Sequence, residues 1–213
     1  VQASGSLFFA GLVVLLLLAW LARDRAKRAL VAEFHTLIEI VHRKYRSEQA
    51  LRDPLTGAYN KAALEELWPH YFKRAERSQA LLVLAVFDVD DFHELNNRFG
   101  HIAGDSALVE LAEILRSSTR GSDLVVRYGG DEFVALLEET SRAGAEIVIA
   151  RVQQQLRVRN DGLPPDQVPL GVTAGAALFH KGMDLLTLFA LADQDLLQRK
   201  ALRRGPASER ARA

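Results

Sequence analysis

The segment from Arg127 to Phe133, with the sequence RYGGDEF, combines residue types and spacing that indicate chemistry. Two consecutive glycines stand between two apolar runs, and glycine accepts the positive φ angles that tight turns require, so the pattern predicts a β-hairpin. The turn places two carboxylates, Asp131 and Glu132, side by side. Adjacent strand residues point to opposite faces, so one carboxylate can bind a metal while the other has a different role. Taken alone, the same residues are also compatible with a solvated acidic turn.

A second acidic group follows the apolar run 81–87, which has the length of a buried strand. The run ends in Asp88-Val89-Asp90-Asp91, so this strand delivers carboxylates at its carboxyl end, a common position for a site. Carboxylates that converge without cysteine or a histidine pair favour a hard cation such as Mg²⁺, usually shared with substrate phosphates. The alternative for Asp90 and Asp91 is a helix N-cap.

The elements around these residues predict an α+β sandwich with a mostly antiparallel central sheet flanked by helices, of the split βαβ type. Asn60 is a plausible cap for the first helix of this domain. The expected order of elements is a helix over 60–77, a strand over 81–87, and helices over 92–99 and 105–118. A hairpin of two strands over 124–137, a helix over 141–158, a strand over 170–179 and a helix over 183–203 follow.

Composition excludes some classes of function. The chain has 213 residues, a formal net charge of zero and no cysteine. A zero net charge gives no electrostatic footprint for DNA or RNA, so no nucleic-acid partner is expected. Without cysteine there are no disulfides and no thiolate metal sites.

Residues 1–22 are predicted to form a transmembrane segment. The uncharged run from Ser6 to Ala22 is close to the length that crosses a bilayer, and Trp20 lies near one end, where interfacial aromatics are found. Four basic residues between Arg23 and Arg28 follow, so the positive-inside rule places the rest of the chain in the cytoplasm, anchored to the inner membrane. A cleaved signal peptide is the alternative, although positive charge before the apolar run is missing.

Residues 23–52 are predicted to form a helical, coiled-coil-like stalk. Apolar side chains recur with spacings of three and four, the pattern of a dimeric seam, at Val31, Phe34, Ile38, Val41 and Tyr45. The competing interpretation is a helix that packs on the following domain. Asp53-Pro54 ends this segment, a domain follows over 53–205, and the tail 206–213 is predicted to be disordered.

Several motifs in order resemble the GGDEF-domain diguanylate cyclases. Gly129-Gly130-Asp131-Glu132-Phe133 is similar to the signature of that family, and the segments 53–60, 88–105 and 192–204 resemble its other motifs. The resemblance covers residues 51 to about 205. It implies a nucleotidyl-cyclase palm of ferredoxin-like type, acting as a homodimer that condenses two GTP molecules into cyclic di-GMP with release of pyrophosphate.

The resemblance also implies roles for individual residues. Asp88, the carbonyl of Val89 and Asp131 would hold Mg²⁺, with Mn²⁺ as an alternative ion, and Asp131 or Glu132 would accept the proton of the attacking hydroxyl. The backbone N–H groups of Asp91, Phe92 and His93 would bind phosphates together with Lys200 and Arg204.

Two further pairs match sites of the family. Asn96 and Asp105 match the guanine-binding pair, and a carboxylate that accepts from guanine N1–H argues for GTP over ATP. Asp105 could also serve as a helix N-cap. Arg120 and Asp123 match the inhibitory site at which cyclic di-GMP binds, with a surface ion pair as the alternative.

His93 departs from the family pattern, because a lysine usually stands there. Histidine is mostly uncharged near neutral pH, so a permanent charge is lost at a position expected to act on the phosphates. Slower or pH-sensitive turnover is the resulting hypothesis. A GGDEF domain that binds GTP or cyclic di-GMP without catalysis is the alternative function, and a membrane-tethered dimerisation module is the third.

Overall fold

The computed structural model describes residues 20, 23, 33, 49–164 and 168–204 of the chain. The predicted disordered tail lies outside these residues, as do nearly all of the predicted transmembrane segment and most of the predicted coiled-coil stalk. Within the described ranges, no helix is both long and apolar enough to cross a membrane. The chain divides into two compact units, and the second begins at Leu51, two residues before the predicted domain boundary.

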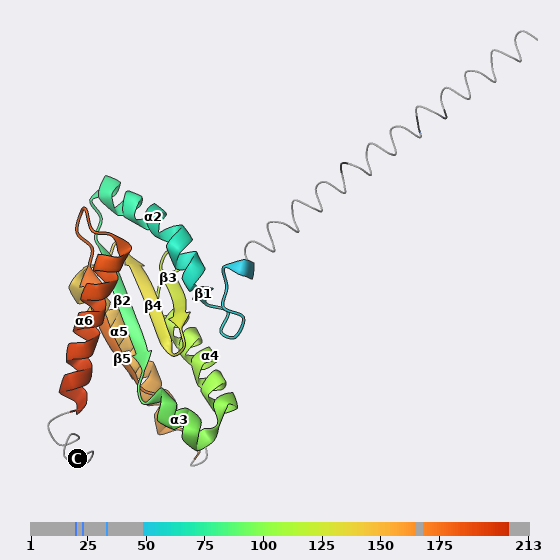
Figure 1. The fold of residues 1–213 in the computed structure, drawn as a ribbon, viewed down its shortest axis with the longest axis vertical. Coiled ribbons are helices and arrows are strands. Elements are labelled where there is room, and N and C mark those ends of the chain that lie inside the picture. The colour runs from blue at the N-terminus through green and yellow to red at the C-terminus, as the bar shows by residue number, and fades with distance from the viewer. Residues whose placement is uncertain (1–19, 21–22, 24–32, 34–48, 165–167, 205–213) are drawn as a thin grey trace, which may run out of the picture. The chain divides into compact units, whose positions relative to one another are not determined.

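The second unit is built on a five-stranded sheet with the strand order β1-β3-β4-β2-β5 (Figure 1). The strands are β1 (Tyr59–Asn60), β2 (Leu82–Val89), β3 (Leu124–Gly129), β4 (Glu132–Glu138) and β5 (Val172–Leu178). The prediction of a mostly antiparallel sheet is corrected to a mixed sheet, because β1 runs parallel to β3 while the other neighbours are antiparallel. The sequence analysis missed β1, since two residues are too few to show an alternating pattern.

The order of helices and strands after Asn60 otherwise agrees with the prediction. The helices are α2 (Lys61–Ser78), α3 (Phe92–Phe99), α4 (His101–Ser118), α5 (Arg142–Asp161) and α6 (Leu185–Arg204). Helix α4 begins four residues earlier than expected, because Gly100 has a φ of +85° and lets the chain reverse directly after α3. Asp105 therefore lies inside α4, and its interpretation as an N-cap is wrong.

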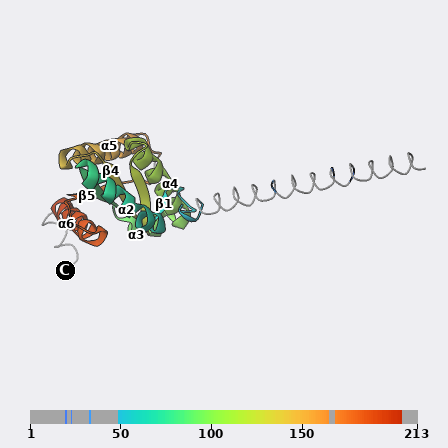
Figure 2. The same ribbon diagram turned by 90° about the horizontal axis from the view of Figure 1, so that it is seen from above.

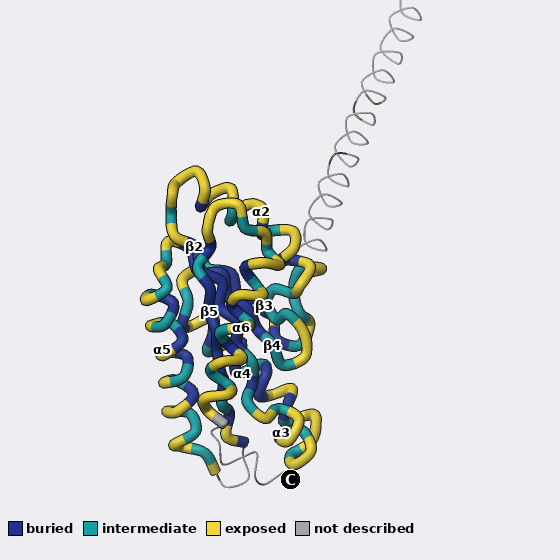
Figure 3. Tube along the Cα trace, turned by 60° about the vertical axis from the view of Figure 1, so that its left-hand side comes forward, coloured by how far each residue is buried: buried dark blue, intermediate teal, exposed yellow. Residues whose placement is uncertain are grey.

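Helices cover both faces of the sheet, so the domain has three layers (Figure 2). Helices α3, α4 and α5 contribute to one core with Val83, Ala85 and Phe87 of β2. Helices α2 and α6 share the other core with the alternate residues of the same strand. Figure 3 shows the strands as the most buried part of the domain. Burial on both faces explains why β2 is a continuous apolar run and does not alternate with polar residues.

The domain opens with a hydrogen-bonded turn between Asp53 and Asn60. The side chain of Asp53 accepts hydrogen bonds from the Thr56 backbone N–H at 2.9 Å and from its hydroxyl at 2.7 Å. The Asn60 side chain then accepts from the Ala63 N–H at 2.9 Å and caps α2, which confirms the predicted cap.

Candidate functional site

The two predicted acidic clusters meet at one end of the sheet. Strand β3 ends at Gly129 and β4 begins at Glu132, so Gly130, with a φ of +51°, and Asp131 form the predicted tight turn. Asp88, near the end of β2, lies directly opposite Glu132 in the antiparallel register. The Val89 N–H also donates to the Asp131 carbonyl oxygen at 3.3 Å. The structure thus places the carboxylates of the hairpin beside those of β2.

Arg127 fixes the position of the turn. Its Nε and Nη2 donate to the Gly130 carbonyl oxygen at 3.0 and 2.8 Å, and its Nη1 donates to both carboxylate oxygens of Asp53 at 3.1 and 3.3 Å. Burial alone would raise the pKa of Asp53, but hydrogen bonds from Thr56 and Arg127 lower it below its ordinary value. The guanidinium therefore links the opening turn of the domain to the acidic hairpin. The sequence analysis assigned no role to Arg127.

Two cations of α6 lie against the carboxylates of the β2 end. Lys200 Nζ is 2.5 Å from Asp88 Oδ1. Arg203 contacts Asp90 through Nη1 and donates through Nη2 to Asp91 at 3.0 Å. The same carboxylate of Asp90 accepts from the Thr173 hydroxyl at 2.6 Å. These acids and the two cations line a small pocket. Lys200, a predicted phosphate ligand, therefore contacts Asp88, a predicted metal ligand. Arg203 was not among the predicted residues.

Burial and neighbouring charges raise the pKa of two acids at this end of the sheet, Glu132 and Asp90. Partial burial raises the pKa of Glu132, the nearby charges of Asp88, Asp131 and Asp193 raise it further, and Lys200 partly offsets them. Burial likewise raises the pKa of Asp90, against the lowering effect of its hydrogen bond from Thr173. This end of the sheet therefore carries concentrated negative charge, which a cation would relieve.

The predicted phosphate cradle opens α3. Asp91 takes the N-cap position with a left-handed φ of 53°, and its side chain makes no capping hydrogen bond. The first N–H groups of the helix are consequently not capped by that side chain, as an anion site requires. His93 is exposed in the first turn. Arg204 is the last residue of α6, and its side chain lies outside the described part of the structure.

The predicted guanine-binding residues lie on adjacent helices. Asn96 is on α3, and its Oδ1 atom is buried without a hydrogen-bond partner among the described residues. Asp105 is exposed on α4 and follows Gly104. A Cβ atom at Gly104 would lie only 2.0 Å from Asn96 Oδ1, so a glycine here lets the amide approach the backbone next to Asp105. A buried acceptor without a partner costs free energy, which a donor on a ligand would recover.

Comparison with known proteins places this arrangement in a family. The family described as "Diguanylate cyclase, GGDEF domain" matches residues 50–206, the whole of the unit that carries both acidic clusters. The chain belongs to this GGDEF family. The glycines and acids of the β3–β4 hairpin are its signature, so the resemblance noted in the sequence is confirmed.

Relatives of known activity share the GGDEF domain. The chain is 35% identical over 159 residues to the diguanylate cyclase DgcP of Pseudomonas aeruginosa, covering 75% of this chain and 24% of that protein. It is 33% identical over 165 residues to the diguanylate cyclase DgcS of Shewanella oneidensis, covering 78% and 54%. The chain therefore spans about a quarter and about half of the length of these two relatives.

Solved structures agree with the GGDEF fold. The diguanylate cyclase SiaD of Pseudomonas aeruginosa, solved with its activator SiaC, superposes with a TM-score of 0.70 at 31% identity, covering 86% of this chain and 70% of that chain. The coiled coil and GGDEF domain of DgcB from Caulobacter crescentus, solved in complex with c-di-GMP, gives a TM-score of 0.74 at 22% identity, covering 84% and 95%. This second likeness supports the fold alone.

The predicted inhibitory pair, Arg120 and Asp123, is joined through the backbone N–H of Arg120, which differs from a surface ion pair between side chains. The Asp123 carboxylate accepts from the backbone N–H of Arg120 at 2.8 Å and from that of Glu138 at 3.0 Å. Asp123 therefore holds the turn before β3 in this GGDEF domain. Arg120 is exposed beside it, on the surface of the domain.

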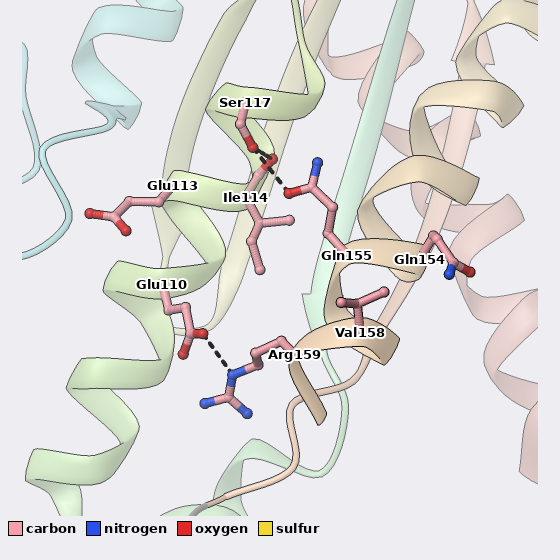
Figure 4. A pocket seen from close by; sticks show the side chains of 8 residues that line it. All are labelled: Glu110, Glu113, Ile114, Ser117, Gln154, Gln155, Val158 and Arg159. Atoms are coloured by element: carbon pink, nitrogen blue, oxygen red, sulfur yellow. Dashed lines mark hydrogen bonds and ion pairs between the residues drawn. The ribbon is translucent and has the colours of Figure 1, made fainter. Parts of the chain in front are cut away.

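A hollow between α4 and α5 lies outside the acidic site (Figure 4). Its polar side chains are largely paired with each other: Arg159 donates to Glu110 at 2.7 Å and Ser117 to Gln155 at 3.2 Å. Ile114 and Val158 provide its apolar surface. These pairs connect α4 to α5, so we interpret the hollow as a helix–helix junction of the GGDEF domain.

Proposed function

We propose that this GGDEF domain is a diguanylate cyclase that condenses two GTP molecules into cyclic di-GMP and two pyrophosphates. Each 3′-hydroxyl attacks the α-phosphorus of the other GTP, a new P–O bond forms, the bond to the β-phosphate breaks, and pyrophosphate leaves. The observation that carries this proposal is the placement of Asp131 and Glu132 beside Asp88 at one end of the sheet. Relatives at 33–35% identity that are diguanylate cyclases support it.

The donor set fits Mg²⁺, with Mn²⁺ as an alternative. Across the described ranges, no three His, Asp or Glu side chains are grouped as a ready-made metal site. Mg²⁺ needs no such group, because it is usually held by one or two carboxylates, waters and substrate phosphates. Asp88 and Asp131 would supply the carboxylates and Val89 its carbonyl oxygen. The amine of Lys200, 2.5 Å from Asp88, shows that this position accepts positive charge. Bound there, the ion would neutralise phosphate charge and acidify the attacking hydroxyl.

Glu132 or Asp131 would take the proton of the 3′-hydroxyl. Burial and neighbouring carboxylates raise the pKa of Glu132, which makes it a stronger base than an ordinary carboxylate once it is ionised. The guanine would be recognised by Asn96 and Asp105, and its amino group would donate to Asn96 Oδ1, which has no partner in the part of the chain that the structure describes. The uncapped start of α3 and Lys200 would bind the β- and γ-phosphates, with Arg204 as a further candidate.

The reaction requires two copies of the domain, because each site offers one set of guanine and phosphate ligands and the product contains two nucleotides. We therefore propose a homodimer in which two sites face each other. We also propose that cyclic di-GMP, the product, inhibits the enzyme by binding to the exposed Arg120. Asp123 shapes the turn that carries this arginine.

One assay tests the function. The purified chain is incubated with GTP and Mg²⁺, and cyclic di-GMP and pyrophosphate are separated and quantified. We expect both products in a one-to-two ratio, specific activity that increases with protein concentration, and loss of product in Asp131→Asn. Saturable GTP binding without product would select the non-catalytic binding module, and the absence of both would reject the cyclase and the GTP-binding module.

A further inference from the structure

Arg203 occupies an unusual position between two carboxylates of different exposure. Its guanidinium contacts Asp90, whose side chain is 10% exposed, and Asp91, whose side chain is 56% exposed. The Asp90 carboxylate is fixed in addition by the Thr173 hydroxyl at 2.6 Å. Nη1 of the guanidinium therefore contacts a largely buried carboxylate, while Nη2 contacts a solvent-exposed one.

The two contacts of Arg203 differ in how easily another anion can replace them. Ion pairs with exposed carboxylates contribute little, because water solvates both partners when they separate. A contact with a partly buried carboxylate is harder to break, since separation leaves a charge with poor solvation. We expect Nη1 to stay on Asp90 while Nη2 leaves Asp91 when a stronger anion arrives.

The nearest place for such an anion is the start of α3. Asp91 is the N-cap residue of this helix and leaves its first N–H groups without a side-chain cap. Arg203 Nη2, 3.0 Å from the Asp91 carboxylate, thus lies next to a helix N-terminus that favours negative charge. Lys200, three residues earlier on α6, is held at Asp88 on the same side of the site. The fork of an arginine suits phosphate oxygens better than a single ammonium does.

We infer that Arg203 is a phosphate ligand of this domain, which keeps its contact with Asp90 and exchanges Asp91 for the β- or γ-phosphate of the bound nucleoside triphosphate. The inference rests on the proposed function, since it requires a nucleoside triphosphate at this site. It gives the start of α3 a permanently charged arginine beside Asp91, where the sequence carries His93 in place of the lysine usual in the family.

Binding measurements without turnover test this role. The probes are 3′-deoxy-GTP, which lacks the attacking hydroxyl, and 3′-deoxy-GMP, which lacks the β- and γ-phosphates. Both are titrated in Mg²⁺ by calorimetry into the wild-type chain and into Arg203→Gln. We expect Arg203→Gln to weaken triphosphate binding about tenfold, the size of one charge-assisted hydrogen bond at a partly exposed site, and to leave monophosphate binding unchanged.

Three variants control the comparison. Arg157→Gln removes an exposed arginine of α5 whose guanidinium donates to Gln154, away from the acidic site, and this variant should bind like the wild type. Asp91→Asn removes the competing carboxylate and should bind the triphosphate at least as tightly as the wild type. Arg203→Lys keeps the charge without the fork and should show an intermediate loss, and it also serves if the glutamine variant folds poorly.

Two results would overturn the inference alone: wild-type affinity of Arg203→Gln for the triphosphate, or an equal loss in Arg203→Gln and Asp91→Asn. The second would mean that Arg203 only holds α3 in place through Asp91. A wild-type chain that binds no guanosine triphosphate would overturn the proposed function together with the inference, so the two failures are distinguishable.

Discussion

Replacing Arg127 by methionine should destabilise the domain much more than the loss of an exposed arginine. The side chains of Arg127 and Asp53 are each 17% exposed, and the guanidinium makes four hydrogen bonds, two to Asp53 and two to the Gly130 carbonyl oxygen. Methionine retains much of the apolar stem but none of these bonds. Asp53 keeps its hydrogen bonds from Thr56. The variant therefore leaves a carboxylate partly satisfied and a carbonyl oxygen unpaired.

The expected cost follows from these contacts. A charge-assisted hydrogen bond contributes about 1.5–3 kcal/mol, and complete loss of one partner of a buried pair costs about 3–5 kcal/mol. Because the pair retains some exposure and Thr56 remains, we expect Arg127→Met to lower the free energy of unfolding by about 2–3 kcal/mol. In a double-mutant cycle with Asp53→Asn, the coupling energy should be about 1–2 kcal/mol, since half of the arginine's bonds go to the backbone.

Urea unfolding followed by tryptophan fluorescence measures this cost. A Trp20→Phe background leaves Trp68, which is buried in the α2 core, as the single tryptophan, so the signal reports on the GGDEF domain. Arg157→Met is the matched control and should change the free energy by less than about 0.5 kcal/mol. A cost for Arg127→Met equal to that of the control, or a coupling energy near zero, would refute the role of Arg127 as the link between the opening turn and the hairpin.

Three further perturbations test the packing and electrostatics of the site. Gly104→Ala should lower the free energy of unfolding by about 1–3 kcal/mol in urea, because its Cβ would lie 2.0 Å from Asn96 Oδ1; a cost no larger than that of Gly121→Ala, where no atom lies within 4 Å, would contradict this. Glu132→Gln should stabilise the metal-free domain at neutral pH by less than about 1 kcal/mol, because burial and neighbouring carboxylates raise the pKa of Glu132 and disfavour its charged form. Thermal unfolding in EDTA should show this gain disappear below about pH 4, where the glutamate is protonated in both states, and a gain that persists there would count against it. Asp195→Asn should cost about 1–2 kcal/mol at neutral pH, because hydrogen bonds from a backbone N–H and an arginine, acting against burial, lower the pKa of Asp195. That difference should shrink as the pH falls from about 5 toward 2, where the folded-state carboxylate protonates, and a pH-independent difference in urea unfolding would exclude the charge as its cause.

The acidic parts of the site could be predicted because their signals are local. The double glycine between apolar runs defines the hairpin that carries Asp131 and Glu132, and the apolar run before Asp88 defines β2. A carboxylate at the end of a buried strand and one at a hairpin turn need only the correct strand pairing to meet. That pairing places Asp88 opposite Glu132.

The basic parts could not be predicted from local signals. Arg127 and Asp53 are 74 positions apart, and Arg203 and Asp91 are 112 apart. Arginines are common and mostly exposed, so neither Arg127 on β3 nor Arg203 on α6 stands out in the sequence. The family resemblance drew attention to Lys200 and Arg204, whereas the orientation of α6 on the sheet directs Arg203 to the carboxylates. This orientation is set by the packing of α6 on β5 and β2, which no periodicity within α6 reveals.

The arrangement explains how so many carboxylates coexist at one end of a sheet. Lys200 and Arg203 offset the charges of Asp88, Asp90 and Asp91, while the hairpin acids Asp131 and Glu132 form no ion pair with the described residues. Burial, together with the charges of Asp88, Asp131 and Asp193, raises the pKa of Glu132, and Lys200 offsets this effect only in part. Negative charge of this kind disfavours the folded state unless a cation binds. Under the proposed function, a metal ion bound with the nucleoside triphosphate would supply that cation. The same lysine and arginine are then available for the phosphates, because the metal would take over their role at the carboxylates.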